Sequence, residues 1–293
     1  MQISPQEGMG VVVEGFDPAT ADDEEVATLK RVIYERKIAV IKGQAIDPAG
    51  FLAFGSRMGT AQPYYEEIYR HPDVAEVFVS SNVAGRGGGA GVPKTGKFWH
   101  SDYQFMPRPF DFTILCPQEV PRQNRGTYFL DLSAAYEKLD DTLKKGLADT
   151  RALHSVRRYF KIRPSDVYRP LVEIMDEIEK RTPPVSFPTV LRHPVTGASV
   201  PYVSAGFTYA IEDESGTPQP ELLHDLLEAT GQLDRTFEHE NIHLQRFDRG
   251  DVLIWDNRGM VHHALHPAWA STDPVVSYRV TVYDPHQGDW LPA

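Results

Sequence analysis

The chain has 293 residues, of which 41% are hydrophobic, and its formal net charge at pH 7 is −11. This length and apolar share are enough for one globular domain over residues 1–293 with a substantial core. The acidic charge argues against a nucleic acid or an anionic membrane as partner, because neither attracts a negative surface. Cys116 is the single cysteine, and we find neither a signal peptide nor an apolar run long enough to span a membrane. We therefore expect a cytoplasmic protein.

The first quarter of the chain contains short strands and helices. Residues 11–14 and 37–43 are apolar and strand-like, and residues 22–37 carry apolar side chains at helical spacing behind an acidic first turn. Residues 47–59 begin with Asp-Pro, which is typical of a helix N-terminus. A further strand is predicted at 76–81.

The segment 85–97 is too rich in glycine to be regular, and it ends in a sequence that resembles a phosphate-binding loop. The stretch GVPKTGKF is one residue short of the pattern G-x-x-x-x-G-K-[ST], because Phe98 stands where a hydroxyl is needed. The glycines also lead into an aromatic stretch instead of a helix. We interpret the segment as a lid loop beside a site.

The middle of the chain, near 133–187, is predicted to be a basic and partly helical insert that follows β-like segments at 110–116 and 126–132. Such a basic cluster in an acidic chain is either a solvated face or an anion-binding site. The clustered residues are Arg157, Arg158, Lys161, Arg163 and Arg169.

A helix at 219–231 and β-like segments between 245 and 284 complete the chain. Short strands dominate, helices are inserted between them, and strands and helices do not alternate regularly. This pattern favours a mainly β fold with inserted helices, a double-stranded β-helix or jelly roll, over a doubly wound sheet.

His100 and Asp102, in the stretch FWHSDYQF, have a spacing suited to chelating a metal. In an extended strand, side chains two positions apart share a face, so both can reach one ion. Two histidines and one carboxylate on one face of an octahedron form the facial triad of non-haem Fe(II) oxygenases. The H-x-D pattern alone is weak, and a strand-edge histidine beside a solvated aspartate is the alternative.

A second metal-like motif is HExxH, formed by His239, Glu240 and His243. On a helix it would present two imidazoles and a general base, as in zinc hydrolases. The following sequence is alternating and β-like, which is poor context for a helix, so a zinc hydrolase is a remote alternative. A stronger source of a third ligand is WDNRGMVHHAL, where His262 and His263 are adjacent.

The order of WHSD, RGT, WDNRGMVHHA and YRVTVYD resembles the taurine dioxygenase family of Fe(II) and 2-oxoglutarate-dependent oxygenases. The resemblance implies that His100, Asp102 and His262 bind Fe(II) and that His263 faces away. It also implies that the chain uses 2-oxoglutarate and O₂.

The same resemblance implies that Thr127 and Arg279 contact 2-oxoglutarate. A planar guanidinium binds a carboxylate through two hydrogen bonds and keeps its charge at any working pH, which suits Arg279 to this role.

A narrower resemblance is to the bacterial isonitrile-forming oxygenases, which act on 3-[(carboxymethyl)amino] fatty acids in isonitrile lipopeptide biosynthesis. It is carried by PYYEEIY, VPKTGKFWHSDYQFMPRPF, NRGTYF, KIRPSDVYRP and HHALHP. The implied substrate is a small anionic amino acid or fatty acid. The implied pocket residues are His266 beside 2-oxoglutarate and, around the substrate, Tyr64, Tyr65, Tyr69, Tyr103, Arg125 and Lys161.

Other functions stay open. A 2-oxoglutarate-dependent hydroxylase of another amino, carboxylic or sulfonic acid would share the triad and Arg279 but would have no use for the tyrosines and Lys161. A non-catalytic jelly-roll binding protein would need no complete triad. The sequence is also compatible with a homo-oligomer and does not determine the oligomeric state.

Overall fold

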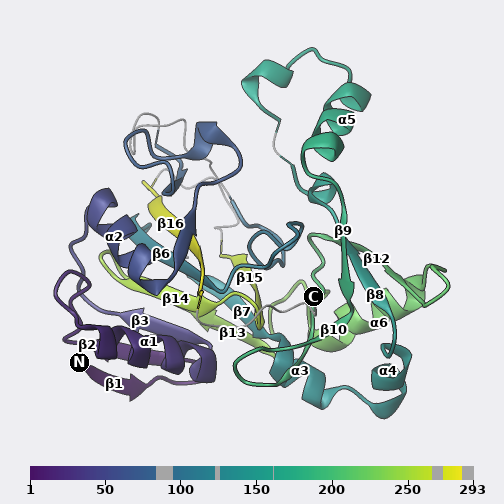
Figure 1. Ribbon diagram of the computed structural model, residues 1–293, viewed down its shortest axis with the longest axis horizontal. Helices are drawn as coiled ribbons and strands as arrows, with labels where there is room; N and C mark the ends of the chain where they lie inside the picture. Colours follow the sequence, from purple (N-terminus) through teal and green to yellow (C-terminus); the bar gives the residue numbers. More distant parts are fainter. Residues whose placement is uncertain (84–94, 123–125, 161, 266–272, 286–293) are drawn as a thin grey trace.

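The computed structural model describes residues 1–83, 95–122, 126–160, 162–265 and 273–285. In this part of the chain the fold is mainly β, with helices on the outside of a sandwich made of a larger and a smaller sheet (Figure 1). This is the jelly roll that the sequence predicts.

Eight strands form the larger sheet, in the order β1-β2-β3-β14-β6-β16-β4, and β5 also pairs with β16. All of these pairings are antiparallel except that of β2 with β3, which are connected through helix α1. The strands are β1 Gln2–Pro5, β2 Val11–Glu14, β3 Ile38–Ile41, β4 Thr60–Gln62, β5 Phe78–Ser81, β6 Phe112–Glu119, β14 Val252–Asp256 and β16 Val276–Tyr283.

The smaller sheet has the order β13-β7-β15 and packs on the inner face of the larger one. Its strands are β13 Ile242–Gln245, β7 Thr127–Asp131 and β15 Met260–Ala264. Phe129 and Met260 of this sheet share a buried cluster with Leu253 and Trp255 of β14. A turn at 257–259 leads from β14 in one sheet to β15 in the other.

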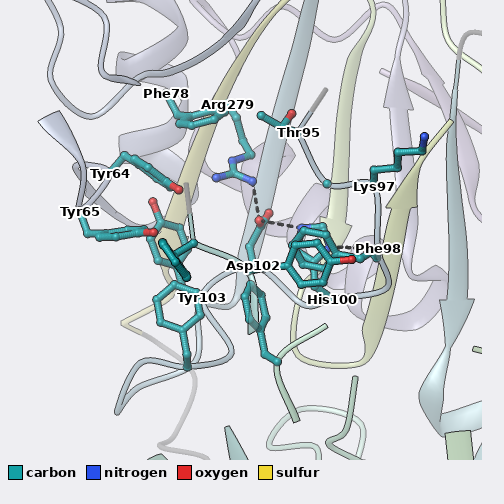
Figure 2. Close-up of a pocket in the computed structure, with 15 residues that line it drawn as sticks. Tyr64, Tyr65, Phe78, Thr95, Lys97, Phe98, His100, Asp102, Tyr103 and Arg279 are labelled. Atoms are coloured by element: carbon teal, nitrogen blue, oxygen red, sulfur yellow. Dashed lines mark hydrogen bonds and ion pairs between the residues drawn. The ribbon is translucent and has the colours of Figure 1, made fainter. Parts of the chain in front are cut away.

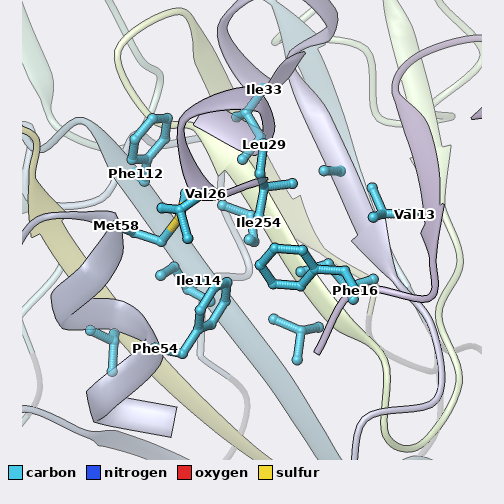
Figure 3. Packing of buried hydrophobic residues seen from close by; sticks show 14 of the residues in the cluster. Val13, Phe16, Val26, Leu29, Ile33, Phe54, Met58, Phe112, Ile114 and Ile254 are labelled. Atoms are coloured by element: carbon cyan, nitrogen blue, oxygen red, sulfur yellow. The ribbon is translucent and has the colours of Figure 1, made fainter. Parts of the chain in front are cut away.

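Alternation along β6 decides which side chains reach the space between the sheets. Phe112 and Ile114 face outward into a cluster with helices α1 and α2 (Figure 3). Thr113 and Leu115 therefore face inward, because successive side chains of a strand point to opposite faces. Leu115 pairs directly with Arg279 of β16, which places that arginine on the inner face as well.

Helix α1 (Asp23–Arg36) and helix α2 (Pro48–Met58) cover the outer face, and both confirm the sequence predictions. Asp22 and Glu25 form a capping box at the start of α1. Asp47 caps α2, and Pro48 occupies its first turn, where a missing N–H has no consequence.

The segment 133–187 contains strands as well as the predicted helices. It contributes β8 and β9 to a third sheet of order β12-β8-β9, and α5 projects from the body of the molecule (Figure 1). The remaining elements are α3 Leu132–Lys138, α4 Asp141–Gly146, β8 Arg151–His154, α5 Leu171–Arg181, β9 Val185–Pro188, β10 Val190–Arg192, β11 Ser199–Pro201, β12 Thr208–Glu212 and α6 Pro220–Thr230, with 3-10 turns at Glu67–Tyr69, Val156–Arg158 and Pro164–Asp166.

Helix α6 confirms the helix predicted at 219–231. None of the helices among the described residues has the length and apolar character needed to cross a membrane.

Candidate metal centre and its two cavities

His100 and His262 are held side by side by a short antiparallel bridge. The backbone N–H of His100 donates to the carbonyl of His262 at 3.1 Å, and that of His262 donates back at 2.8 Å. The two imidazole centroids lie 4.2 Å apart. Strand β15 therefore supplies one histidine and also fixes the segment that carries the other.

Asp102 does not lie in an extended strand, so the strand geometry predicted for the H-x-D pair is wrong. Asp102 begins a turn that is fixed by Asn257, whose Oδ1 accepts from the Asp102 N–H at 2.9 Å and whose Nδ2 donates to its carbonyl at 3.1 Å. Its carboxylate still reaches both histidines, 3.7 Å from Nε2 of His100 and 3.9 Å from Nε2 of His262.

The three side chains offer one ligand atom each within 4.8 Å of one another, and all three are buried. Nδ1 of His100 lies 2.8 Å from the carbonyl of Phe98, which can only accept, so the Nε2 lone pair is available to an ion. Burial lowers the pKa of both histidines, and at His262 the neighbouring His100 adds to the effect. Neutral imidazoles and a carboxylate fit a divalent cation such as Fe(II).

Arg279 of β16 contacts the same carboxylate, with Nη1 2.5 Å from Oδ1 of Asp102. Burial opposes ionisation of Asp102, but Arg279 and the two imidazoles outweigh it and hold the pKa of Asp102 below its usual value. Burial likewise opposes the charge on Arg279, and Asp102 outweighs it, so the pKa of Arg279 is raised. The guanidinium also lies 4.5 Å from the centre of the Phe78 ring.

A cavity of about 250 Å³ borders His100 and Asp102. Figure 2 shows Tyr64, Tyr65 and Tyr103 on one side of Asp102, with His100 on the other. Burial raises the pKa of each of these tyrosines, so the phenols stay neutral and can donate hydrogen bonds. The rest of the wall is largely apolar and includes Phe78, Phe98, Phe105, Phe160 and Phe207.

A second cavity, of about 140 Å³, lies on the His262 side. Thr127 at the start of β7 and Arg279 both line it, together with Trp255. The two cavities adjoin, because Phe78, Thr95, Gly96, His100 and Arg279 border both. Asp102 borders the first cavity and His262 the second, so the triad lies where the two meet.

The sequence model described as taurine catabolism dioxygenase TauD, TfdA family matches residues 2–279. The chain belongs to this family. TauD-family enzymes use Fe(II), 2-oxoglutarate and O₂, and the chain is an Fe(II)/2-oxoglutarate-dependent oxygenase of the TauD family.

Individual relatives agree with this assignment. Pentalenolactone F synthase of Streptomyces avermitilis is 29% identical, covering 98% of this chain and 95% of that protein. The alpha-ketoglutarate-dependent 2,4-dichlorophenoxyacetate dioxygenase of Cupriavidus pinatubonensis is 26% identical, covering 81% and 82%. A solved taurine dioxygenase from Burkholderia xenovorans shares the fold, with a TM-score of 0.75 and 23% identity over 98% of this chain and 91% of that one.

Three of the four tyrosines predicted to contact substrate in this TauD-family chain line the first cavity: Tyr64, Tyr65 and Tyr103. Tyr69 does not. It is buried behind the cavity wall, where its ring packs against Tyr64 and Phe78. The difference arises because residues 67–69 form a 3-10 turn, which sets the orientation of Tyr69 apart from that of its neighbours.

Other predicted residues lie outside the described part of the chain: Arg125, Lys161 and His266. The predicted lid near 85–97 is described only at residues 95–97, and these three line the first cavity.

Besides Arg279, two residues that sequence analysis missed hold Asp102. Asn257 stands inside the D-N-R element, but nothing in the sequence indicates that its amide reaches a residue 155 positions away. Thr113 donates its hydroxyl to Oδ2 of Asp102 at 2.9 Å. The alternation along β6 predicts that the Thr113 side chain points inward. It does not predict that the hydroxyl binds Asp102.

His263 points away from the TauD-family triad. Its ring lies 5.7 Å from the Trp99 ring and 4.9 Å from the Phe237 ring, centroid to centroid. The HExxH motif is not helical, because His243 lies in strand β13 and His239 precedes it in a turn. Across the described residues, the triad is the one group of three or more potential ligands close enough to share an ion.

The basic cluster of the insert is largely paired with acids of the same segment. Arg163 contacts Asp166 at 3.0 Å and Glu177 at 2.8 Å, and Arg169 contacts the same two carboxylates at 3.1 Å and 2.8 Å. Arg157 also pairs with an acid of α5. These arginines therefore connect the loop to α5, which explains their clustering without an external anion.

Proposed function

We propose that the chain oxidises and decarboxylates an N-carboxymethyl 3-amino fatty acid to an isonitrile, with Fe(II) bound by His100, Asp102 and His262. With 2-oxoglutarate and O₂, the bound iron supplies an oxidant that can remove hydrogen from a C–H bond. Thr127 and Arg279 hold the cosubstrate in the second cavity, and the substrate occupies the first.

The observation that carries the proposal is the position of the triad between two cavities of different character. Arg279 borders both cavities, but only the second adds the Thr127 hydroxyl, and this pair suits the distal carboxylate of 2-oxoglutarate. The first combines neutral phenols near Asp102 with phenylalanine rings, which suits a polar head group joined to an alkyl chain.

The carboxymethyl group is supported by the narrower sequence resemblance and by one relative. 2,4-Dichlorophenoxyacetate, named for the Cupriavidus protein, carries an O–CH₂–COO⁻ arm. An N-carboxymethyl amine carries the corresponding N–CH₂–COO⁻ arm. Contacts of Arg125 and Lys161 with the substrate, and of His266 with 2-oxoglutarate, rest on the resemblance alone.

The reaction balances over two rounds of oxidation. Each round consumes one O₂ and one 2-oxoglutarate, releases succinate and CO₂, and takes two hydrogens from the substrate to form water. After two rounds the substrate has lost four hydrogens: one from the amine, two from the methylene and one from the carboxylic acid. The carboxyl group leaves as CO₂, and the remaining nitrogen and carbon form the isonitrile. The chain's part is to hold the methylene beside the metal and to exclude water from the oxidant.

Mass spectrometry of the products tests this function. Anaerobically purified protein would receive Fe(II), 2-oxoglutarate, a 3-[(carboxymethyl)amino] fatty acid and then O₂. We expect a product that has lost CO₂ and four hydrogens, and none with Asp102→Ala. A product that gains one oxygen and keeps its carboxylate would indicate a hydroxylase instead, and an untouched substrate would contradict the substrate assignment.

A further inference from the structure

Thr113 is a fully buried polar residue on the inner face of β6. Its neighbours across the sheet are Trp255 of β14 and Thr281 of β16. A buried hydroxyl without a hydrogen-bond partner destabilises a fold, so the contact that it makes is informative. Thr113 donates to Oδ2 of Asp102 at 2.9 Å.

The two oxygens of the Asp102 carboxylate have different surroundings. Oδ2 receives the Thr113 hydroxyl and lies 3.9 Å from Nε2 of His262. Oδ1 pairs with Arg279 at 2.5 Å and lies 3.7 Å from Nε2 of His100. Asn257 fixes the backbone of Asp102 on both its N–H and its carbonyl. It does not contact the carboxylate, whose rotation about χ2, a torsion with a broad energy minimum, is limited by Arg279 at Oδ1 and by Thr113 at Oδ2.

We propose that Thr113 is a positioning residue for the metal ligand Asp102. Its hydroxyl engages Oδ2 while Arg279 engages Oδ1, so that the carboxylate keeps the orientation in which its oxygens lie beside His100 and His262. Partners of metal ligands orient those ligands, and their loss typically weakens metal affinity 10- to 100-fold. The inference rests on the proposed metal site.

Binding of Mn(II) alone, measured by equilibrium titration without substrate or turnover, separates a positioning role from a purely structural one. Thr113→Val removes the hydroxyl and keeps the shape, whereas Thr113→Ser keeps the hydroxyl. Thr189→Val is the matched control, because Thr189 is also fully buried and its hydroxyl is bonded to Thr150 at 2.8 Å. Thermal unfolding of each metal-free variant reports stability separately.

We expect Thr113→Val to bind Mn(II) about tenfold more weakly or worse, and Thr113→Ser and Thr189→Val to bind within about threefold of wild type. If Thr113→Val does not fold, Thr113→Ala removes the same hydroxyl with less volume. Wild-type affinity in the folded valine or alanine variant, or equal loss in the serine variant, would overturn the proposal. Failure of the wild-type protein to bind Mn(II) would instead contradict the metal site itself.

Discussion

The register of strand β15 determines which of two adjacent histidines, His262 or His263, faces the metal site. His262 faces Asp102 and His100, whereas the next residue, His263, packs among aromatic rings on the opposite face of β15. A shift of one residue in the strand would exchange their places, because successive side chains of a strand alternate.

Iron content after anaerobic loading checks this register. We expect His262→Ala to lose most of the bound Fe(II), because only two ligands remain, and His263→Ala to keep it. Equal loss in both variants, or loss in His263→Ala alone, would show that the register is wrong.

Arg279 is the residue on which cosubstrate affinity should depend. Arg279→Lys keeps a positive charge but cannot form two parallel hydrogen bonds with a carboxylate. We expect the dissociation constant of 2-oxoglutarate, titrated in the presence of Mn(II), to rise about tenfold or more, which corresponds to about 1.4 kcal/mol. Arg151→Lys, an exposed arginine on β8, is the control. Near-native affinity in Arg279→Lys would exclude the assigned role.

At the scale of elements, the segment before His100 is held by a close backbone approach. Gly206 donates its N–H to the carbonyl of Trp99 at 2.9 Å. A Cβ at position 206 would meet the Phe98 ring and would lie 2.7 Å from the Trp99 carbonyl oxygen.

Gly206→Ala should therefore displace the Phe98–His100 segment and weaken Mn(II) binding. The exposed Gly146→Ala in α4 should not, because its Cβ would meet only the end of the Leu222 side chain, at 3.2 Å. The two variants would be compared by metal titration and thermal unfolding. Unchanged Mn(II) affinity in Gly206→Ala would mean that the segment adapts without moving His100.

The third sheet contains a buried histidine that should make stability depend on pH. His154 of β8 is fully buried, and burial lowers its pKa to about 3. An unfolded histidine has a pKa near 6.5, so between these values the unfolded chain binds the extra proton. The stability that comes from keeping His154 neutral is fully present above about pH 6.5 and is lost as the pH falls toward 3.

His154→Leu should make the free energy of unfolding depend less on pH between about 3 and 6.5, because the substitution removes the titrating group. The wild-type free energy of unfolding should fall by about 1.4 kcal/mol more than that of the variant for each pH unit below 6.5. Denaturant unfolding of wild type, His154→Leu and the exposed control His224→Leu between pH 4 and 8 gives the measurement. An unchanged slope in His154→Leu would assign the acid sensitivity to other groups.

At the scale of the whole molecule, sequence analysis predicted the features that depend on local pattern. Apolar side chains at helical spacing behind an acidic first turn located α1, and Asp47 with Pro48 located α2. The dominance of short strands with inserted helices indicated the jelly roll. The order of the motifs also pointed to the family that the comparison later established.

Features that depend on contacts between distant segments could not be predicted. The turn at Asp102 is held by Asn257, and its carboxylate accepts a hydrogen bond from Thr113, and neither contact leaves a local signal in the sequence. Tyr69 looked equivalent to Tyr64 in sequence, but the 3-10 turn places it behind the wall of the first cavity. The pairing of Arg163 and Arg169 with acids of α5 likewise required the fold.

The ratio of succinate to oxidised product tests the proposed function of the whole molecule most directly. With limiting 2-oxoglutarate and an excess of a 3-[(carboxymethyl)amino] fatty acid, both products would be quantified in the same reaction. Because four hydrogens leave the substrate, we predict about two succinates for each isonitrile. One succinate for each product, with the carboxylate retained, would contradict the account.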